Sequence, residues 1–411
     1  MAYKPISHSR SRQRDLLIIL ILGALSTVSP FSIDMYLPAF PQIAHDLGTT
    51  PAEISLSVSG YFIGLALGQL FYGPLLDRFG RKMPLYAGMS LFILASFGCL
   101  AAHTPGLFIA FRLLQAVGGC VASVGAVAMV RDFFPVEEAA KILSLLILVL
   151  SVSPLFAPTI GSFVTTTIGW RWIFAILGGF AVFVMAIVAL FLPEGHKPDP
   201  DISLKPGAVL GEFLKIIENP KFYTYAIGGA FSFAGLFVYV TGSPIIFIDT
   251  YRVGARGYGL IFAVLAASFI GGSQFNIYLS RRHQDQRIFR IALVCQNVII
   301  LIMLFGTALG WFGLAANILL LMLYLPFCGM AYPNAAAIAL SPFRKNVGSA
   351  SALLGFIQMG VGALASTGVG LLHASDSLPI YAVMAATAVI GLVILLANQQ
   401  RVLEFSNGGD E

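Results

Sequence analysis

The sequence predicts an all-α membrane protein that crosses the bilayer twelve times. Three observations support this prediction: the composition, the length of the apolar runs and the distribution of the basic residues. Of the 411 residues, 58% are hydrophobic and only 10% are charged, whereas about 25% of residues are charged in soluble domains. We therefore expect the chain to lie in the lipid bilayer, and we attribute its net charge of +5 to membrane topology rather than to nucleic-acid binding.

Apolar runs predict the number of helices. A spanning helix needs about 20 mainly apolar residues. Twelve runs of about this length occur in the sequence, at 16–40, 54–76, 84–102, 106–131, 140–163, 171–192, 222–247, 257–280, 289–309, 313–340, 349–372 and 379–399. The polar segment after the sixth run carries apolar residues at helical spacing, which predicts a short amphipathic helix on the membrane surface. We expect a six-helix bundle over 1–192, a cytoplasmic linker over 193–221 and a second six-helix bundle over 222–411.

The basic residues predict the orientation. With twelve spans, 20 of the 24 Lys and Arg residues fall on one side of the membrane. The other side has Arg171, Arg252 and Arg256, and Arg112 lies within a span. Because cytoplasmic loops are enriched in Lys and Arg, we expect a multi-pass protein of the bacterial inner membrane with both termini in the cytoplasm.

Patterns typical of enzymes are missing from the sequence. It contains no Ser/His/Asp, HExxH, CxxC or phosphate-loop pattern, so neither enzyme chemistry nor direct use of ATP is expected. The four cysteines and six histidines show no spacing typical of a disulfide framework or a metal site. We therefore expect no enzyme, no metal and no cofactor.

One acid and one base are placed within the predicted spans. Asp34 is the only one of the nineteen acids inside a span, and Arg112 is the only such base. Ionisable groups in a membrane are costly and by default functional. The two residues lie at similar predicted depths, so their opposite charges could neutralise each other. We expect them to couple protons to transport; the alternative is a purely structural buried pair.

The loop between the second and third runs carries an ordered motif. Its stretch Gly73–Lys82 places an acid at the end of a span, a glycine in a tight turn and bases at the inner surface. The motif residues are Gly73, Asp77, Arg78, Gly80, Arg81 and Lys82. This pattern resembles the loop 2–3 signature of the major facilitator superfamily. The resemblance implies the major facilitator fold and an inner gate in which Asp77 contacts the start of span 11, near Asn346–Ser349, in the outward-open state.

Further motifs resemble those of a particular branch of that superfamily. Arg112 and Gln115 match the span-4 signature of proton-coupled members, with Ala116 at a position that is usually glycine. The span-5 residues Pro154, Ala157, Pro158 and Gly161 are similar to the signature of drug–proton antiporters. Asp34–Pro38 resembles the span-1 signature of the bicyclomycin/chloramphenicol resistance (Bcr/CflA) branch. Other segments that fit this branch are Arg131–Phe133, Trp170–Phe174 and Gly348–Leu353.

The resulting functional hypothesis is a proton-coupled antiporter that exports small, amphipathic, drug-like molecules, acting as a monomer. Candidates for the substrate pocket are Asp34, Tyr36, Tyr61, Gln69, Gln115, Phe231, Tyr239, Asn334 and Gln358. The amides are preferred, because a polar group in the membrane needs a partner, whereas aromatic residues at helical spacing more often pack. One alternative is an exporter of an endogenous sugar or amino acid on the same fold. Another is a membrane receptor or enzyme that transports nothing.

Overall fold

The computed structural model describes residues 12–195, 198–199, 206–343, 347–372 and 376–407. Within these ranges the chain is helical, and twelve candidate membrane spans are long and apolar enough to cross a bilayer. The elements are α1 (Arg12–Asp34), η1 (Leu37–Ala39), α2 (Phe40–Asp46), α3 (Pro51–Arg78), α4 (Lys82–Leu100), α5 (Pro105–Phe133), α6 (Val136–Thr167), α7 (Arg171–Phe191), α8 (Pro206–Ile217), α9 (Pro220–Pro244), η2 (Ile245–Thr250), α10 (Ala255–Ser280), α11 (Asp285–Ala308), α12 (Leu314–Leu340), α13 (Val347–Leu371) and α14 (Ser377–Asn407). The prediction of an all-α fold with twelve spans is confirmed.

Several spans begin where the sequence places a capping residue before a proline. Thr50 precedes α3, Thr104 precedes α5 and Asn219 precedes α9, and each side chain accepts a hydrogen bond from a backbone N–H of the first turn. A proline follows each cap. Proline suits the first helical position because its missing N–H would have no partner there.

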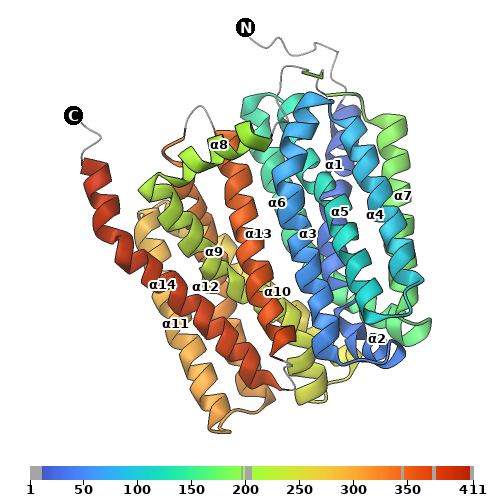
Figure 1. Ribbon diagram of the computed structural model, residues 1–411, viewed down its shortest axis with the longest axis vertical. Helices are drawn as coiled ribbons and strands as arrows, with labels where there is room; N and C mark the ends of the chain where they lie inside the picture. Colours follow the sequence, from blue (N-terminus) through green and yellow to red (C-terminus); the bar gives the residue numbers. More distant parts are fainter. Residues whose placement is uncertain (1–11, 196–197, 200–205, 344–346, 373–375, 408–411) are drawn as a thin grey trace.

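The helices form two groups that lie side by side (Figure 1). The first group comprises α1 to α7, and the second comprises α9 to α14. The groups contact each other mainly where α3 packs against α13 and α6 packs against α10. We call this contact the seam. The domain boundaries at 192 and 222 stay a prediction.

The start of α1, the end of α14 and the linker helix α8 lie at one end of the molecule, and α2 lies at the other (Figure 1). Following the predicted orientation, we call these the inner end and the outer end. In α8, Ile216 is buried, whereas Leu214 and Ile217 are exposed. A helix is present where the sequence predicts one, and its amphipathic role on the membrane surface stays a prediction.

Spans 1 and 7 both depart from regular α-helix next to a proline. In span 1, α1 ends at Asp34 and a short 3₁₀ helix containing Pro38 follows. In span 7, α9 ends at Pro244 and continues as the π-helix η2. The two prolines are 206 residues apart. Because π-helical turns are frequent at functional sites, these two breaks direct attention to the outer end of the seam.

Candidate functional site

Arg112 lies in a fully buried cage of polar and aromatic side chains on the inward face of α5. Its Nη1 donates to the hydroxyl of Ser32 at 2.8 Å, and its Nη2 donates to the carbonyl oxygen of Ser32 at 2.9 Å. Nη1 also donates to the side chain of Gln115. The guanidinium carbon lies 4.3 Å from the ring centroids of both Tyr36 and Tyr61. The cation is therefore held by hydrogen bonds and by two aromatic faces.

The cage explains how a cation is tolerated there without an acid. Ser32 lies in the last turn of α1, where carbonyl groups lack partners within the helix and the helix dipole is negative. The two contacts to Ser32 therefore let Arg112 cap the end of α1. Gln115 is held in place by its own bond to Ser96, at 2.7 Å, so it orients the cation from the other side.

The expected neutralisation of Asp34 by Arg112 is absent from this conformation. Within the described ranges no ion pair joins the two residues, and no hydrogen bond to the Asp34 side chain is found there. Arg112 instead contacts Ser32, two residues earlier. The physical reason is that α1 ends here. The backbone carbonyl of Ser32 is therefore free to accept from the guanidinium, and it lies closer to the guanidinium than the Asp34 carboxylate does.

Asp34 sits at the break in span 1 and is only 5% exposed. On the side of the first group, α6 packs directly against the break. A Cβ atom added to Gly161 would lie 1.6 Å from the carbonyl oxygen of Met35, so only glycine allows this approach. The predicted role of the span-5 glycine in close helix packing therefore has a specific partner, which is the residue after Asp34.

The second group supplies tyrosines on the opposite side of Asp34. The helices α9 and α10 both contact η1. Tyr239 of α9 and Tyr258 of α10 are buried and lie near Asp34. The acid thus lies between the two helix groups, at the outer end of the seam.

The outer half of the seam is closed by direct contacts. The hydroxyl of Ser366 on α13 donates to that of Ser59 on α3 at 3.0 Å. The rings of Phe62 and Phe237 are 4.4 Å apart between centroids. Further along the seam, a Cβ added to Gly355 would lie 2.8 Å from the amide oxygen of Gln69.

The structure distributes the other predicted pocket residues over three places. Tyr36, Tyr61 and Gln115 belong to the Arg112 cage and are fully buried. Gln69 lies on the seam, and Gln358 is buried on α13, one of the seam helices. Asn334 lies inside the second group, where its amide donates to Asn276 at 2.7 Å and to the backbone of α12. Phe231 is half-buried on α9.

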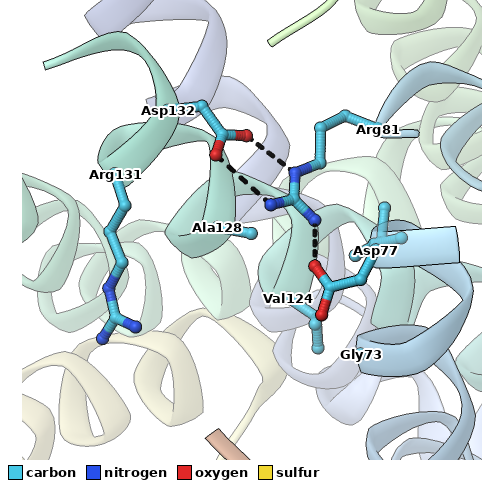
Figure 2. A pocket seen from close by; sticks show the side chains of 8 residues that line it. Gly73, Asp77, Arg81, Val124, Ala128, Arg131 and Asp132 are labelled. Atoms are coloured by element: carbon cyan, nitrogen blue, oxygen red, sulfur yellow. Dashed lines mark hydrogen bonds and ion pairs between the residues drawn. The ribbon is translucent and has the colours of Figure 1, made fainter. Parts of the chain in front are cut away.

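The inner-gate motif forms a buried ion-pair network. Arg81 contacts Asp132 at the end of α5, at 2.7 Å, and Asp77 at 2.6 Å. Figure 2 shows Arg81 between the two acids and Arg131 pointing away from them. Burial lowers the pKa of Arg81, but hydrogen bonds and charges from Asp132 and Asp77 outweigh it, so its pKa is raised above the usual value.

A cavity of about 410 Å³ adjoins this network. It is lined by Gly73, Leu76, Asp77, Arg81, Val124, Ala128, Arg131 and Asp132 (Figure 2). Leu76, Arg81 and Asp132 are buried in its lining, whereas the side chain of Asp77 is about half exposed, at 49%. The cavity therefore opens beside the acid that the motif places at the inner end of α3.

The turn of the motif has its own supports. Gly80 has φ +81°, which favours glycine. Glu194, after α7, accepts hydrogen bonds from the backbone N–H groups of Arg81 and Lys82, at 2.7 and 3.4 Å. These groups lie at the start of α4 and have no partner within that helix. Arg78, also in the motif, ends α3.

The predicted contact of Asp77 with the start of span 11 is not observed among the described residues. Asn346 lies outside the described ranges, and α13 begins at Val347. In this conformation Asp77 accepts from Arg81. A contact that forms only in the outward-open state, as predicted, stays a prediction.

Sequence reasoning missed four residues of these networks: Ser32, Asp132, Glu194 and Tyr258. Asp132 stands in the stretch Arg131–Phe133, which resembles the branch, and Ser32 precedes the Asp34–Pro38 motif, but neither motif assigns these two residues a partner. An acid that closes span 4 at the side with most bases is a signal that could have pointed to Asp132. Glu194 and Tyr258 carry no signal in the sequence, because only the fold brings them to their partners.

Comparison with known proteins agrees with this fold. The model of the Major Facilitator Superfamily matches residues 22–367. Among solved structures, a D-xylose–proton symporter aligns with a TM-score of 0.74 and 15% identity, over 92% of this chain and 97% of that one. The nucleoside transporter NupG aligns with a TM-score of 0.72 and 12% identity, over 94% and 99%. The chain belongs to the major facilitator superfamily, whose members are membrane transporters and not enzymes.

Curated relatives bear out the predicted branch. A bicyclomycin resistance protein homolog of Haemophilus influenzae is 30% identical over 92% of this chain and 94% of its own length. An MFS-type transporter of Bacillus subtilis, YdgK, is 31% identical over 93% and 96%. A chloramphenicol resistance protein of Pseudomonas aeruginosa is 28% identical over 67% and 65%. The resemblance to the Bcr/CflA branch is thereby confirmed, and the chain is a multi-pass transporter of small molecules related to drug-resistance exporters.

Proposed function

We propose that this transporter is a proton-coupled antiporter that exports small amphipathic drug-like molecules across the bacterial inner membrane. The observation that carries the proposal is the position of Asp34. It is a buried acid at a helix break, between the two helix groups, and within the described ranges no hydrogen bond or ion pair occupies its side chain. The names of its relatives, which include resistance to bicyclomycin and chloramphenicol, support the substrate class.

The proposed cycle uses Asp34 as a shared site for proton and substrate. Burying a charged carboxylate between apolar helices is unfavourable, so the charge must be removed or compensated before the site closes. A proton from outside neutralises the acid and favours release of substrate. Loss of that proton on the inner side frees the carboxylate for the next substrate molecule.

Other parts of the proposal follow from the remaining residues. We favour three of the pocket candidates: Gln69 and Gln358, on the seam helices α3 and α13, and Tyr239, which lies near Asp34. We infer that both chain termini are cytoplasmic and that the protein acts as a monomer. A reporter fused after α14, active only in the cytoplasm, tests the orientation.

Drug susceptibility of a pump-deficient bacterium tests the proton site. Cells expressing the wild type should survive higher concentrations of bicyclomycin or chloramphenicol than cells without it. Asp34→Asn should remove this resistance while the protein is still produced and inserted. Asp249→Asn is the matched control, because Asp249 is an acid near the outer end of span 7, and it should retain resistance. Full resistance in cells with Asp34→Asn would refute the proposal.

A further inference from the structure

Two buried polar groups face the outer end of the seam without partners. Asp34 belongs to the first helix group, and Tyr239 belongs to the second. Tyr239 is 2% exposed, and its hydroxyl has no hydrogen-bond partner among the described residues. A buried hydroxyl without a partner is unfavourable, as is a buried carboxylate, so each of the two groups lacks what the other offers.

The neighbours of Tyr239 hold its ring in place. The ring stacks on Phe262 of α10 at 5.8 Å, and Phe262 in turn lies 5.9 Å from the ring of Tyr258. Both tyrosines interact electrostatically with Asp34. The hydroxyl of Tyr258, however, is bonded to Ser243 at 2.8 Å. Of these two tyrosines, Tyr239 is therefore the one whose hydroxyl is free to donate.

Of the other charged or titratable groups near this site, Arg112, Arg171 and Tyr258 are already engaged. On the helices that pack around the end of α1 and η1, the other groups are Arg112 on α5, Arg171 on α7, Asp249 after α9, and Arg256 and Tyr258 on α10. Arg112 binds Ser32, and Arg171 binds Asp46 at the outer surface. The facing stretch of α6, from Pro154 to Thr167, carries no charged residue. The nearby Tyr381 interacts with Tyr239 and has a hydroxyl without a partner in the described part of the chain.

We propose that Tyr239 donates a hydrogen bond to the Asp34 carboxylate when neither proton nor substrate occupies it, and that this bond keeps the empty transporter from opening outward. This inference rests on the proposed function, and it adds the residue that makes outward opening depend on a bound proton or substrate. Hydrogen bonds to a charged acceptor are about twice as strong as neutral ones. Protonation of Asp34 weakens the bond, and a bound substrate replaces it, so either ligand releases the two helix groups.

A direct consequence is that the bond prevents proton leakage. A leak requires the protein to carry a proton inward and then to return outward empty. The Tyr239–Asp34 bond blocks the return step, because the deprotonated carboxylate is the form that accepts it. Tyr239→Phe removes the donor but keeps the ring that stacks on Phe262.

Proton flux into liposomes that contain the purified transporter, followed with an internal pH-sensitive dye and no drug present, tests the inference. Tyr239→Phe should leak protons about tenfold faster than the wild type, the change expected when one charge-assisted hydrogen bond is lost. Tyr324→Phe is the matched control: Tyr324 is also a buried tyrosine with an unpartnered hydroxyl in the described part of the chain, but it lies next to Cys328 and not Asp34. Its leak should equal that of the wild type.

The double variant Asp34→Asn/Tyr239→Phe should show no leak, because no proton carrier is left. A leak of Tyr239→Phe equal to that of Tyr324→Phe would overturn the inference, and so would a leak that persists in the double variant. The proposed function is judged separately, by drug resistance of Asp34→Asn cells. If Asp34→Asn cells lost resistance but Tyr239→Phe leaked no faster than the wild type, only the role of Tyr239 would be refuted.

Discussion

The guanidinium of Arg112 donates to the backbone carbonyl of Ser32 at 2.9 Å, so a residue of α5 caps the end of α1. The same guanidinium lies between the rings of Tyr36 and Tyr61. Asp34 follows two residues after Ser32, at the point where the helix stops. The position of the buried acid is thus determined by a cation that does not pair with it.

This relationship predicts that charge alone cannot replace Arg112. Arg112→Lys keeps the positive charge but loses the planar group that stacks on two rings and donates to Ser32 through two nitrogens. We expect the free energy of unfolding to fall by about 2 kcal/mol, which is the cost of leaving a buried acceptor unsatisfied. We also expect a large loss of transport. Thermal unfolding in detergent and drug resistance in cells measure the two effects.

The matched control is Arg171→Lys. Arg171 also contacts an acid, Asp46, but its side chain is 35% exposed at the outer surface, where ion pairs contribute little. Both properties should stay near wild-type values in this control. If Arg112→Lys retained stability and transport, the charge and not the cap would be what matters.

The contact of α6 with the break in span 1 predicts strict intolerance at Gly161. In Gly161→Ala the added Cβ would meet the Met35 carbonyl oxygen at 1.6 Å, and this oxygen belongs to the backbone, which cannot turn aside as a flexible side chain can. The helices must separate, so transport should be abolished and unfolding should occur at lower temperature. Gly179→Ala in α7 is the control, since a Cβ there meets nothing within 4 Å. Equal resistance in cells expressing the two variants would contradict this account.

The outer contact between Ser59 and Ser366 predicts a site for cross-linking. The hydroxyls are 3.0 Å apart on helices of different groups, which is close to the geometry that a disulfide requires. In Ser59→Cys/Ser366→Cys, oxidation should join α3 to α13, keep the outer end closed and stop transport, and a reductant should restore it. Each single cysteine variant should be insensitive to oxidation. Continued transport by the fully cross-linked protein would show that this contact need not open.

The buried network at the inner end predicts unequal roles for its two acids. Asp132→Asn leaves Arg81 without its buried partner, and breaking such a pair costs about 3 kcal/mol. Asp77→Asn should cost less than about 1 kcal/mol, because the Asp77 side chain is 49% exposed and screened by solvent. Thermal unfolding of both variants in detergent measures the difference, and equal losses would contradict the assignment of Asp132 as the principal partner.

The contribution of Arg81 should not change with pH near neutrality. Its pKa is raised in the folded protein, so the stabilisation is complete at every pH below the pKa of an arginine in the unfolded chain. It is lost only as the pH rises through the still higher folded value. The stability difference between wild type and Arg81→Gln should therefore be constant from about pH 6 to pH 9. A steady decline across this range would contradict the raised pKa.

Much of the fold could be predicted because its signals are local. A run of about 20 apolar residues specifies a span whatever surrounds it, and caps such as Thr50 before Pro51 mark where spans begin. Asp34 and Arg112 could be selected because a charge in an apolar run is itself anomalous. The site around them could not be predicted in the same way. Depth along a helix suggested that the two charges neutralise each other, but depth does not specify which face a side chain occupies or which acceptor lies nearest.

By itself, the sequence of this protein determined the twelve spans, the family motifs and the few ionisable groups that the membrane must accommodate. Those features follow from the free energy of transferring single segments and side chains into lipid. Only the tertiary structure decided that Arg112 caps α1, that Gly161 lets α6 pack against the helix break in span 1, and that Tyr239 lies near Asp34 on the other helix group. These relationships join residues 80 to 205 positions apart in the chain. They depend on how helices pack, and no single segment carries that information.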